Sequence, residues 1–76
     1  MSRPVTLDVL AARLCETIRV LAADREAWIA IDRLRLGLQP EEERTIDAAI
    51  AFAGARGWLA ISPAPADHVL LKPGAP

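Results

Sequence analysis

Two glycine-bearing triplets, Leu36-Gly37-Leu38 and Gly57-Trp58-Leu59, enclose a single segment that has the apolar spacing of a helix. Glycine adopts the left-handed backbone conformation that commonly ends a helix, without the steric penalty that a Cβ atom brings. We therefore expect Gly37 to follow one helix and Gly57 to follow the next. The apolar residues between them recur at the i, i+3, i+4, i+7 spacing of one buried helical face: Ile46, Ala49, Ile50 and Ala53.

The start of this helix is marked by a proline and three consecutive glutamates. Pro40 suits the first helical position, where no backbone donor is needed. Glu41, Glu42 and Glu43 complement the positive end of the helix dipole. Because no histidine or second carboxylate cluster accompanies them at ligand spacing, we expect the glutamates to stabilise the helix start and not to bind a metal. Near the other end, Gly54 is expected to weaken the last turn by about 0.5–1 kcal/mol relative to alanine.

The N-terminal part of the chain predicts a longer amphipathic helix from about Thr6 to Ala23, with Thr6 as its N-cap. Its apolar face is formed by residues at helical spacing: Leu7, Leu10, Leu14, Ile18 and Leu21. After a charged break, the segment Ala27–Ile31 is rich in β-branched and aromatic residues. It suits either a short strand or the first turn of a second helix. We favour a short strand that leads into a helix from about Asp32 to Leu36, capped by Asp32.

Two further strands are predicted over Trp58–Ser62 and His68–Lys72. The loop between them, Pro63–Asp67, is too long for a two-residue hairpin turn. On these strands, Leu59 and Ile61 are expected to face the core, opposite Val69 and Leu71. The last four residues, 73–76, are expected to be frayed. The large aromatic residues Trp28 and Trp58 flank the proposed strands and are expected to close a small core.

This order of helix, short strand, short helix, turn, helix and hairpin resembles the winged helix-turn-helix family over about residues 6–72. The resemblance depends on the two glycine-bearing triplets and identifies no subfamily. It implies one α+β domain over residues 1–76, with three helices and a two- or three-stranded antiparallel sheet. In that family, the third helix usually enters the major groove of DNA and the hairpin wing contacts the DNA backbone.

The charge pattern does not favour DNA. The formal net charge is -1, whereas nucleic-acid modules usually carry a basic surplus. The glutamates at the start of the third helix would repel phosphate, and Arg44 is the one residue on its outward face that donates well to a guanine edge or phosphate. DNA binding therefore stays as the alternative function, with a local basic patch as its contact: Arg33, Arg35, Arg44 and Lys72.

Phe52 lies beside the predicted buried face of the third helix and widens its apolar surface. This surface is either a broad buried face beneath the first helix or a contact for a protein partner or a second copy of the chain. The favoured hypothesis is a non-enzymatic module for protein interaction or homodimerisation. Its candidate interface consists of Ala48, Ala51, Phe52 and Ala55.

The sequence supplies no catalytic or ligand-binding motif. Cys15 and His68 are single residues of their kinds without a partner at a recognisable spacing, and no glycine-rich phosphate loop is present. We therefore expect no enzymatic activity, cofactor, metal ion or small-molecule ligand. No apolar run approaches the roughly 20 residues of a membrane span, so no membrane partner is expected. A single cysteine fits a reducing, cytoplasmic setting.

Overall fold

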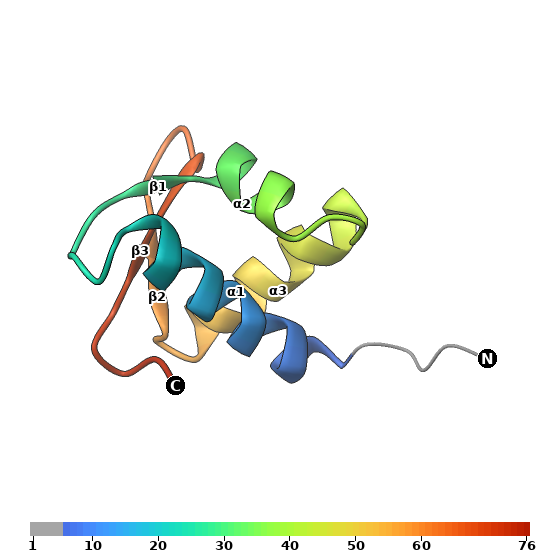
Figure 1. Ribbon diagram of the computed structural model, residues 1–76, viewed down its shortest axis with the longest axis horizontal. Helices are drawn as coiled ribbons and strands as arrows, with labels where there is room; N and C mark the ends of the chain where they lie inside the picture. Colours follow the sequence, from blue (N-terminus) through green and yellow to red (C-terminus); the bar gives the residue numbers. More distant parts are fainter. Residues whose placement is uncertain (1–5) are drawn as a thin grey trace.

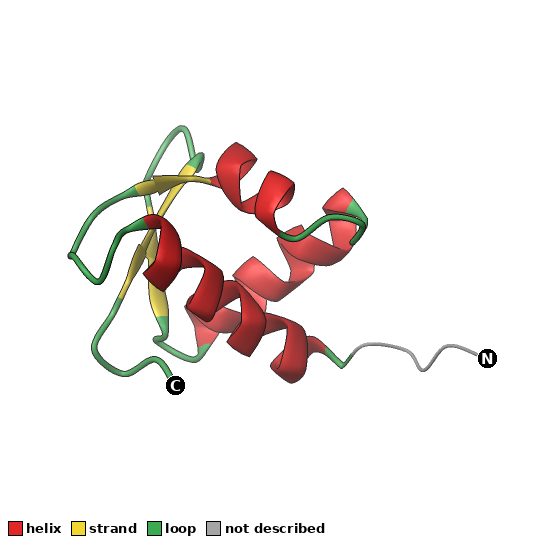
Figure 2. Ribbon diagram, in the orientation of Figure 1, coloured by secondary structure: helices red, strands yellow, loops and turns green. Residues whose placement is uncertain are grey.

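The computed structural model describes residues 6–76 and contains three helices and a three-stranded antiparallel sheet (Figure 1, Figure 2). The elements are α1 (Leu7–Leu21), β1 (Ile29–Ala30), α2 (Ile31–Gly37), α3 (Glu43–Ala55), β2 (Leu59–Ile61) and β3 (His68–Leu71). The sheet order is β1-β3-β2, so β3 is the central strand. The predicted α+β class is confirmed, and the layout is consistent with a winged-helix-like arrangement. Residues 1–5 of the predicted domain lie outside the described part of the chain.

The core lies where α1 and α3 pack across one another against the sheet (Figure 1). The four residues of the predicted stripe on α3 are each at most 4% exposed, which confirms that face. On α1, Leu10, Leu14 and Ile18 are buried as predicted, together with Ala11 and Cys15. Leu7 was expected on the same apolar face but is 41% exposed, because it lies at the first position of the helix.

The predicted strands are confirmed with shorter ends. In the register of the sheet, Leu59 lies opposite Leu71, and Ile61 lies opposite Val69. Leu59 and Val69 are buried as expected. Ile61 does not become part of the core and is 38% exposed. Its side chain lies over Gly54 of α3, where an added Cβ atom would be 3.3 Å from Ile61 Cδ1.

The first helix ends in a Schellman motif without glycine. The main-chain nitrogen of Ala23 donates to Val20 at 3.1 Å, and that of Asp24 donates to Arg19 at 3.1 Å. Ala23 takes the left-handed conformation with φ 53°, and Asp24 has φ 60°. This is the role that glycine usually fills, so the end of α1 carries a steric cost. At the other end, Thr6 occupies the N-cap position as predicted but forms no side-chain capping hydrogen bond.

The boundaries of α2 differ from those predicted. Asp32 is not the N-cap; Ala30 holds that position because β1 runs directly into the helix. The main-chain nitrogen of Ile31 donates to the Asp67 carbonyl at 2.9 Å, so the segment before β3 supplies the acceptor. Gly37 is the last residue of α2 and not a left-handed residue beyond it. Its role is close packing, since a Cβ atom there would lie 3.0 Å from Thr17 Cγ2 of α1.

The start of α3 was also predicted too early. The helix begins at Glu43 with Glu42 as its N-cap, so Pro40 lies in the turn before it and not at its first position. Of the three glutamates, Glu43 alone lies in the first turn. The end of α3 is as predicted: Gly57 has φ +74° and follows the C-cap residue Arg56.

The segment 73–76 is placed against α1, in contrast to the expected fraying. Arg19 Nη2 donates a hydrogen bond to the Pro76 main-chain oxygen at 2.6 Å. A second bond joins the Ala75 main-chain nitrogen to the Lys72 carbonyl at 3.1 Å. Fraying was expected because the sequence alone does not show that Arg19 would reach Pro76, which is far away in the chain.

Candidate interaction surface

Arg35 of α2 is held by three carboxylates that come from two helices. Its Nη1 lies 3.0 Å from Asp32 Oδ1 and 3.3 Å from Glu43 Oε1, and its Nη2 lies 3.0 Å from Asp47 Oδ1. The hydrogen bond with Asp47 is the largest cause that raises the pKa of Arg35. Because the network is partly exposed, each pair contributes at most about 1 kcal/mol to stability. The guanidinium charge of Arg35 is therefore already compensated by neighbouring carboxylates.

Of the other members of the predicted basic patch, Lys72 lies apart from Arg35, whereas Arg33 and Arg44 are on the same two helices as the Arg35 ion pairs. Arg44 pairs with Glu42 at 3.3 Å, and both side chains are strongly exposed. Arg33 is exposed on α2. Lys72 follows the far end of β3, where its main-chain nitrogen donates to the Trp58 carbonyl at 2.9 Å. The start of α2 is beside the opposite end of that strand, because Ala30 pairs with His68.

Lys72 instead lines a cavity of about 340 Å³ at the end of α1, together with Arg19 and Arg25. Two acidic residues, Asp24 and Glu26, line the same cavity. Positive and negative side chains therefore nearly balance there. With three cations against two carboxylates, the lining has a surplus of one positive charge, and Arg19 is already paired with Glu16 at 2.7 Å.

The solvent side of α3 carries three exposed alanines, which we call the α3 outer face: Ala48, Ala51 and Ala55. Phe52 is half-buried at the edge of this face. Its ring meets that of Trp58 edge to face, with centroids 5.8 Å apart and planes at 73°. The Arg56 guanidinium carbon lies 4.9 Å from the Phe52 ring centroid. Phe52 thus serves mainly to extend the core, and the α3 outer face is left open to solvent.

The two tryptophans differ in their packing. Trp58 is half-buried against Phe52 and the core, as expected. Trp28 was also expected to close the core but is 49% exposed. It lies just before β1, which is an edge strand of only two residues, so little of the sheet extends over its ring.

A groove of about 220 Å³ lies beside the α3 outer face. Its residues come from α2, α3, β2 and the loop between β2 and β3: Ile31, Arg35, Asp47, Ile50, Ala51, Ile61 and Ala66. This groove could not be predicted from the sequence, because none of its residues belongs to a recognisable motif. Its formation depends on how the β2–β3 loop returns beside α3.

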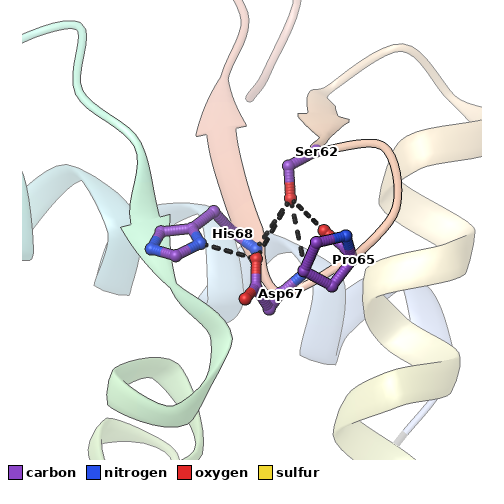
Figure 3. Close-up of polar contacts among 4 residues, drawn as sticks. All are labelled: Ser62, Pro65, Asp67 and His68. Atoms are coloured by element: carbon purple, nitrogen blue, oxygen red, sulfur yellow. Dashed lines mark hydrogen bonds and ion pairs between the residues drawn. The ribbon is translucent and has the colours of Figure 1, made fainter.

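Ser62, Asp67 and His68 form a hydrogen-bonded cluster that holds the β2–β3 loop (Figure 3). Ser62 Oγ donates to the Pro65 carbonyl at 3.0 Å and accepts from the main-chain nitrogens of Asp67 at 3.3 Å and His68 at 3.1 Å. His68 Nδ1 lies 2.7 Å from Asp67 Oδ1, and this hydrogen bond lowers the pKa of Asp67. The imidazole ring extends away from the Ser62 hydroxyl (Figure 3). The cluster therefore organises the loop and supplies no nucleophile–base pair. In the sequence, this role could have been predicted from Ser62 and Asp67, which flank a proline-rich loop.

Cys15 is fully buried in α1, and burial raises the pKa of its thiol. A protonated thiol without solvent access is a poor nucleophile. Across residues 6–76, no group of three histidine, cysteine or carboxylate side chains is placed to hold a metal ion. None of the helices in this range is both long enough and apolar enough to cross a bilayer.

Comparisons of the chain with protein-family models, with curated proteins and with solved structures found no match. The chemistry of the surface itself is therefore the basis for a functional proposal.

Proposed function

We propose that this chain is a small winged-helix-like module that binds a protein partner through the α3 outer face. The observation that carries the proposal is the position of Arg35, whose guanidinium is held by carboxylates of Asp32, Glu43 and Asp47. A winged-helix domain that reads DNA places its third helix in the major groove. Here a phosphate near the start of α3 could contact Arg35 only by displacing the carboxylates that already bind it.

The α3 outer face also lacks the side chains that read bases. Its three alanines offer neither donors nor acceptors to a base edge, whereas arginine, lysine, asparagine and glutamine provide the usual direct contacts. An exposed apolar strip bordered by charged residues resembles the core and rim of a protein–protein interface. Small side chains also let a partner approach the helix backbone closely. These features support protein recognition over DNA recognition.

A second copy of the chain is the first partner to test. Sedimentation velocity over micromolar to millimolar concentrations is expected to show reversible self-association that Ala51→Arg abolishes. Ala12→Arg, which makes the same change at an exposed alanine of α1, is the matched control and is expected to associate like the wild type. Ala51 is preferred to Phe52 because Phe52 contacts Trp58 and Arg56, so its replacement also perturbs the core. A chain that stays monomeric throughout would reject the second copy as the partner.

Titration with a mixed-sequence DNA duplex at low salt tests the alternative. We expect no amide chemical-shift changes centred on residues 33–44 in an NMR titration. Binding through phosphates weakens steeply with added salt. Salt-sensitive shifts at Arg33, Arg35 and Arg44 would therefore overturn the protein-interaction proposal in favour of DNA.

A further inference from the structure

We propose that the groove between α3 and the β2–β3 loop binds an apolar side chain from a basic, amphipathic segment of a partner protein. The inference rests on the proposed function and specifies the partner, because the groove shares Ala51 with the α3 outer face. Its volume of about 220 Å³ decides what kind of occupant it suits. Small-molecule pockets usually span about 300–1,000 Å³, so this groove fits one large side chain better than a cofactor.

The floor and one side of the groove are apolar. Ile31 and Ile50 form the floor and are 8% and 4% exposed. Ile61 lines the side formed by β2 and is 38% exposed, more than any other isoleucine in the described range. An incoming apolar side chain would remove the exposed part of Ile61 from water, which favours binding.

The loop side of the groove is held in place before any partner binds. Ala66 lies in the loop whose Pro65 carbonyl and Asp67 main-chain nitrogen are both bonded to Ser62 Oγ (Figure 3). The Asp67 carbonyl also accepts from the Ile31 main-chain nitrogen at 2.9 Å, which ties the loop to α2. A preorganised wall reduces the conformational entropy that binding would otherwise cost.

The charges near the groove select a cationic partner. Arg35 and Asp47 line the groove, and Arg35 also pairs with Asp32 and Glu43. The carboxylate side chains are 89% exposed for Asp32, 69% for Glu43 and 50% for Asp47. The bonded cluster of one guanidinium and three carboxylates therefore carries two negative charges in excess. A lysine or arginine next to the inserted apolar side chain would meet this excess, whereas an acidic segment would be repelled.

Two matched helical peptides test the proposal, one built of leucine and lysine and the other of leucine and glutamate. Each is titrated into the isotopically labelled full chain while amide chemical shifts are recorded. The leucine–lysine peptide is expected to shift Ile50, Ala51, Ile61 and Ala66 saturably, and to bind at least about tenfold more tightly than the leucine–glutamate peptide. Ala66→Trp, a change in an exposed loop position, fills the groove and is expected to weaken binding at least about tenfold. Ala12→Trp is the matched control and is expected to bind like the wild type.

Equal binding of the two peptides, or unchanged binding by Ala66→Trp, would overturn the groove proposal. Peptide-induced shifts confined to Ala48 and Ala55 would also overturn it, but would leave the α3 outer face as a protein contact. If neither peptide caused chemical-shift changes, the groove proposal would be overturned. The α3 outer face would still be tested separately by sedimentation velocity. A monomeric chain that binds the leucine–lysine peptide in the groove would support the present inference and reject the second copy as its occupant.

Discussion

Gly37 of α2 lies so close to Thr17 of α1 that a Cβ atom on the glycine would be 3.0 Å from Thr17 Cγ2. Alanine is ordinarily favoured over glycine within a helix by about 1 kcal/mol. At this position the methyl group would instead press on a β-branched side chain, whose hydroxyl donates to the Arg13 carbonyl at 2.9 Å. Crowding of this kind typically costs about 1–3 kcal/mol.

We predict that Gly37→Ala lowers the free energy of unfolding by about 1 kcal/mol, measured by urea denaturation. The control is the same change in a Thr17→Ser background, where Cγ2 is absent. There, Gly37→Ala is expected to be neutral or stabilising, because the helix propensity of alanine is no longer opposed. Equal effects in both backgrounds would show that the contact with Thr17 does not determine the choice of glycine.

Ala23→Gly is predicted to stabilise the protein by about 0.5–1 kcal/mol. Ala23 has φ 53° in the Schellman motif that ends α1, and glycine adopts this conformation without strain. The matched control is Ala12→Gly, at an exposed position within α1, which is expected to destabilise by about 1 kcal/mol. Thermal and urea unfolding of both variants would check the opposite signs; a loss of stability in Ala23→Gly would contradict the prediction.

The Asp67–His68 hydrogen bond predicts a pH dependence of the β2–β3 loop. Because the bond lowers the pKa of Asp67 below its ordinary value of 3.8, it stabilises the folded loop above that value. The stabilisation is lost as the pH falls through the lowered pKa and Asp67 becomes protonated. Carbon-detected NMR titration of the Asp67 carboxyl is expected to give a midpoint below 3.8. In His68→Gln the midpoint should move upward; an unchanged midpoint would show that another group lowers this pKa.

The burial of Cys15 predicts that its thiol reacts only when the protein opens. The side chain is fully buried, and its pKa is raised by that burial. Reaction with a thiol reagent under native conditions should therefore be slow and should accelerate with urea as the unfolded population grows. Ala12→Cys adds an exposed thiol on the same helix and is expected to supply a second, rapidly labelled site. Rapid labelling of Cys15 in the wild type would indicate local opening of α1.

The apolar stripes of α1 and α3 could be predicted because periodicity is a local property of the sequence. Residues such as Leu14 and Ile50 become buried wherever their helices pack, so spacing alone identifies the face. The left-handed Gly57 could be predicted for a similar reason, since its conformation depends on the end of its own helix. The start of α2 could not be predicted in this way. Its N-cap is Ala30, and the main-chain N–H of Ile31, the first residue of the helix, donates to the carbonyl of Asp67, which is distant in the chain.

The candidate site also combines features that the sequence predicts with features that depend on contacts between distant residues. The sequence by itself determined that α3 would present alanines in place of base-reading side chains and that acidic residues would gather at its start. Tertiary structure alone decided that Asp32, Glu43 and Asp47 meet at Arg35, and that Ile61 and Ala66 complete a groove beside α3. Helical periodicity follows from torsions and contacts within one element. An ion-pair cluster or a groove depends on the relative placement of several elements, which long-range packing sets.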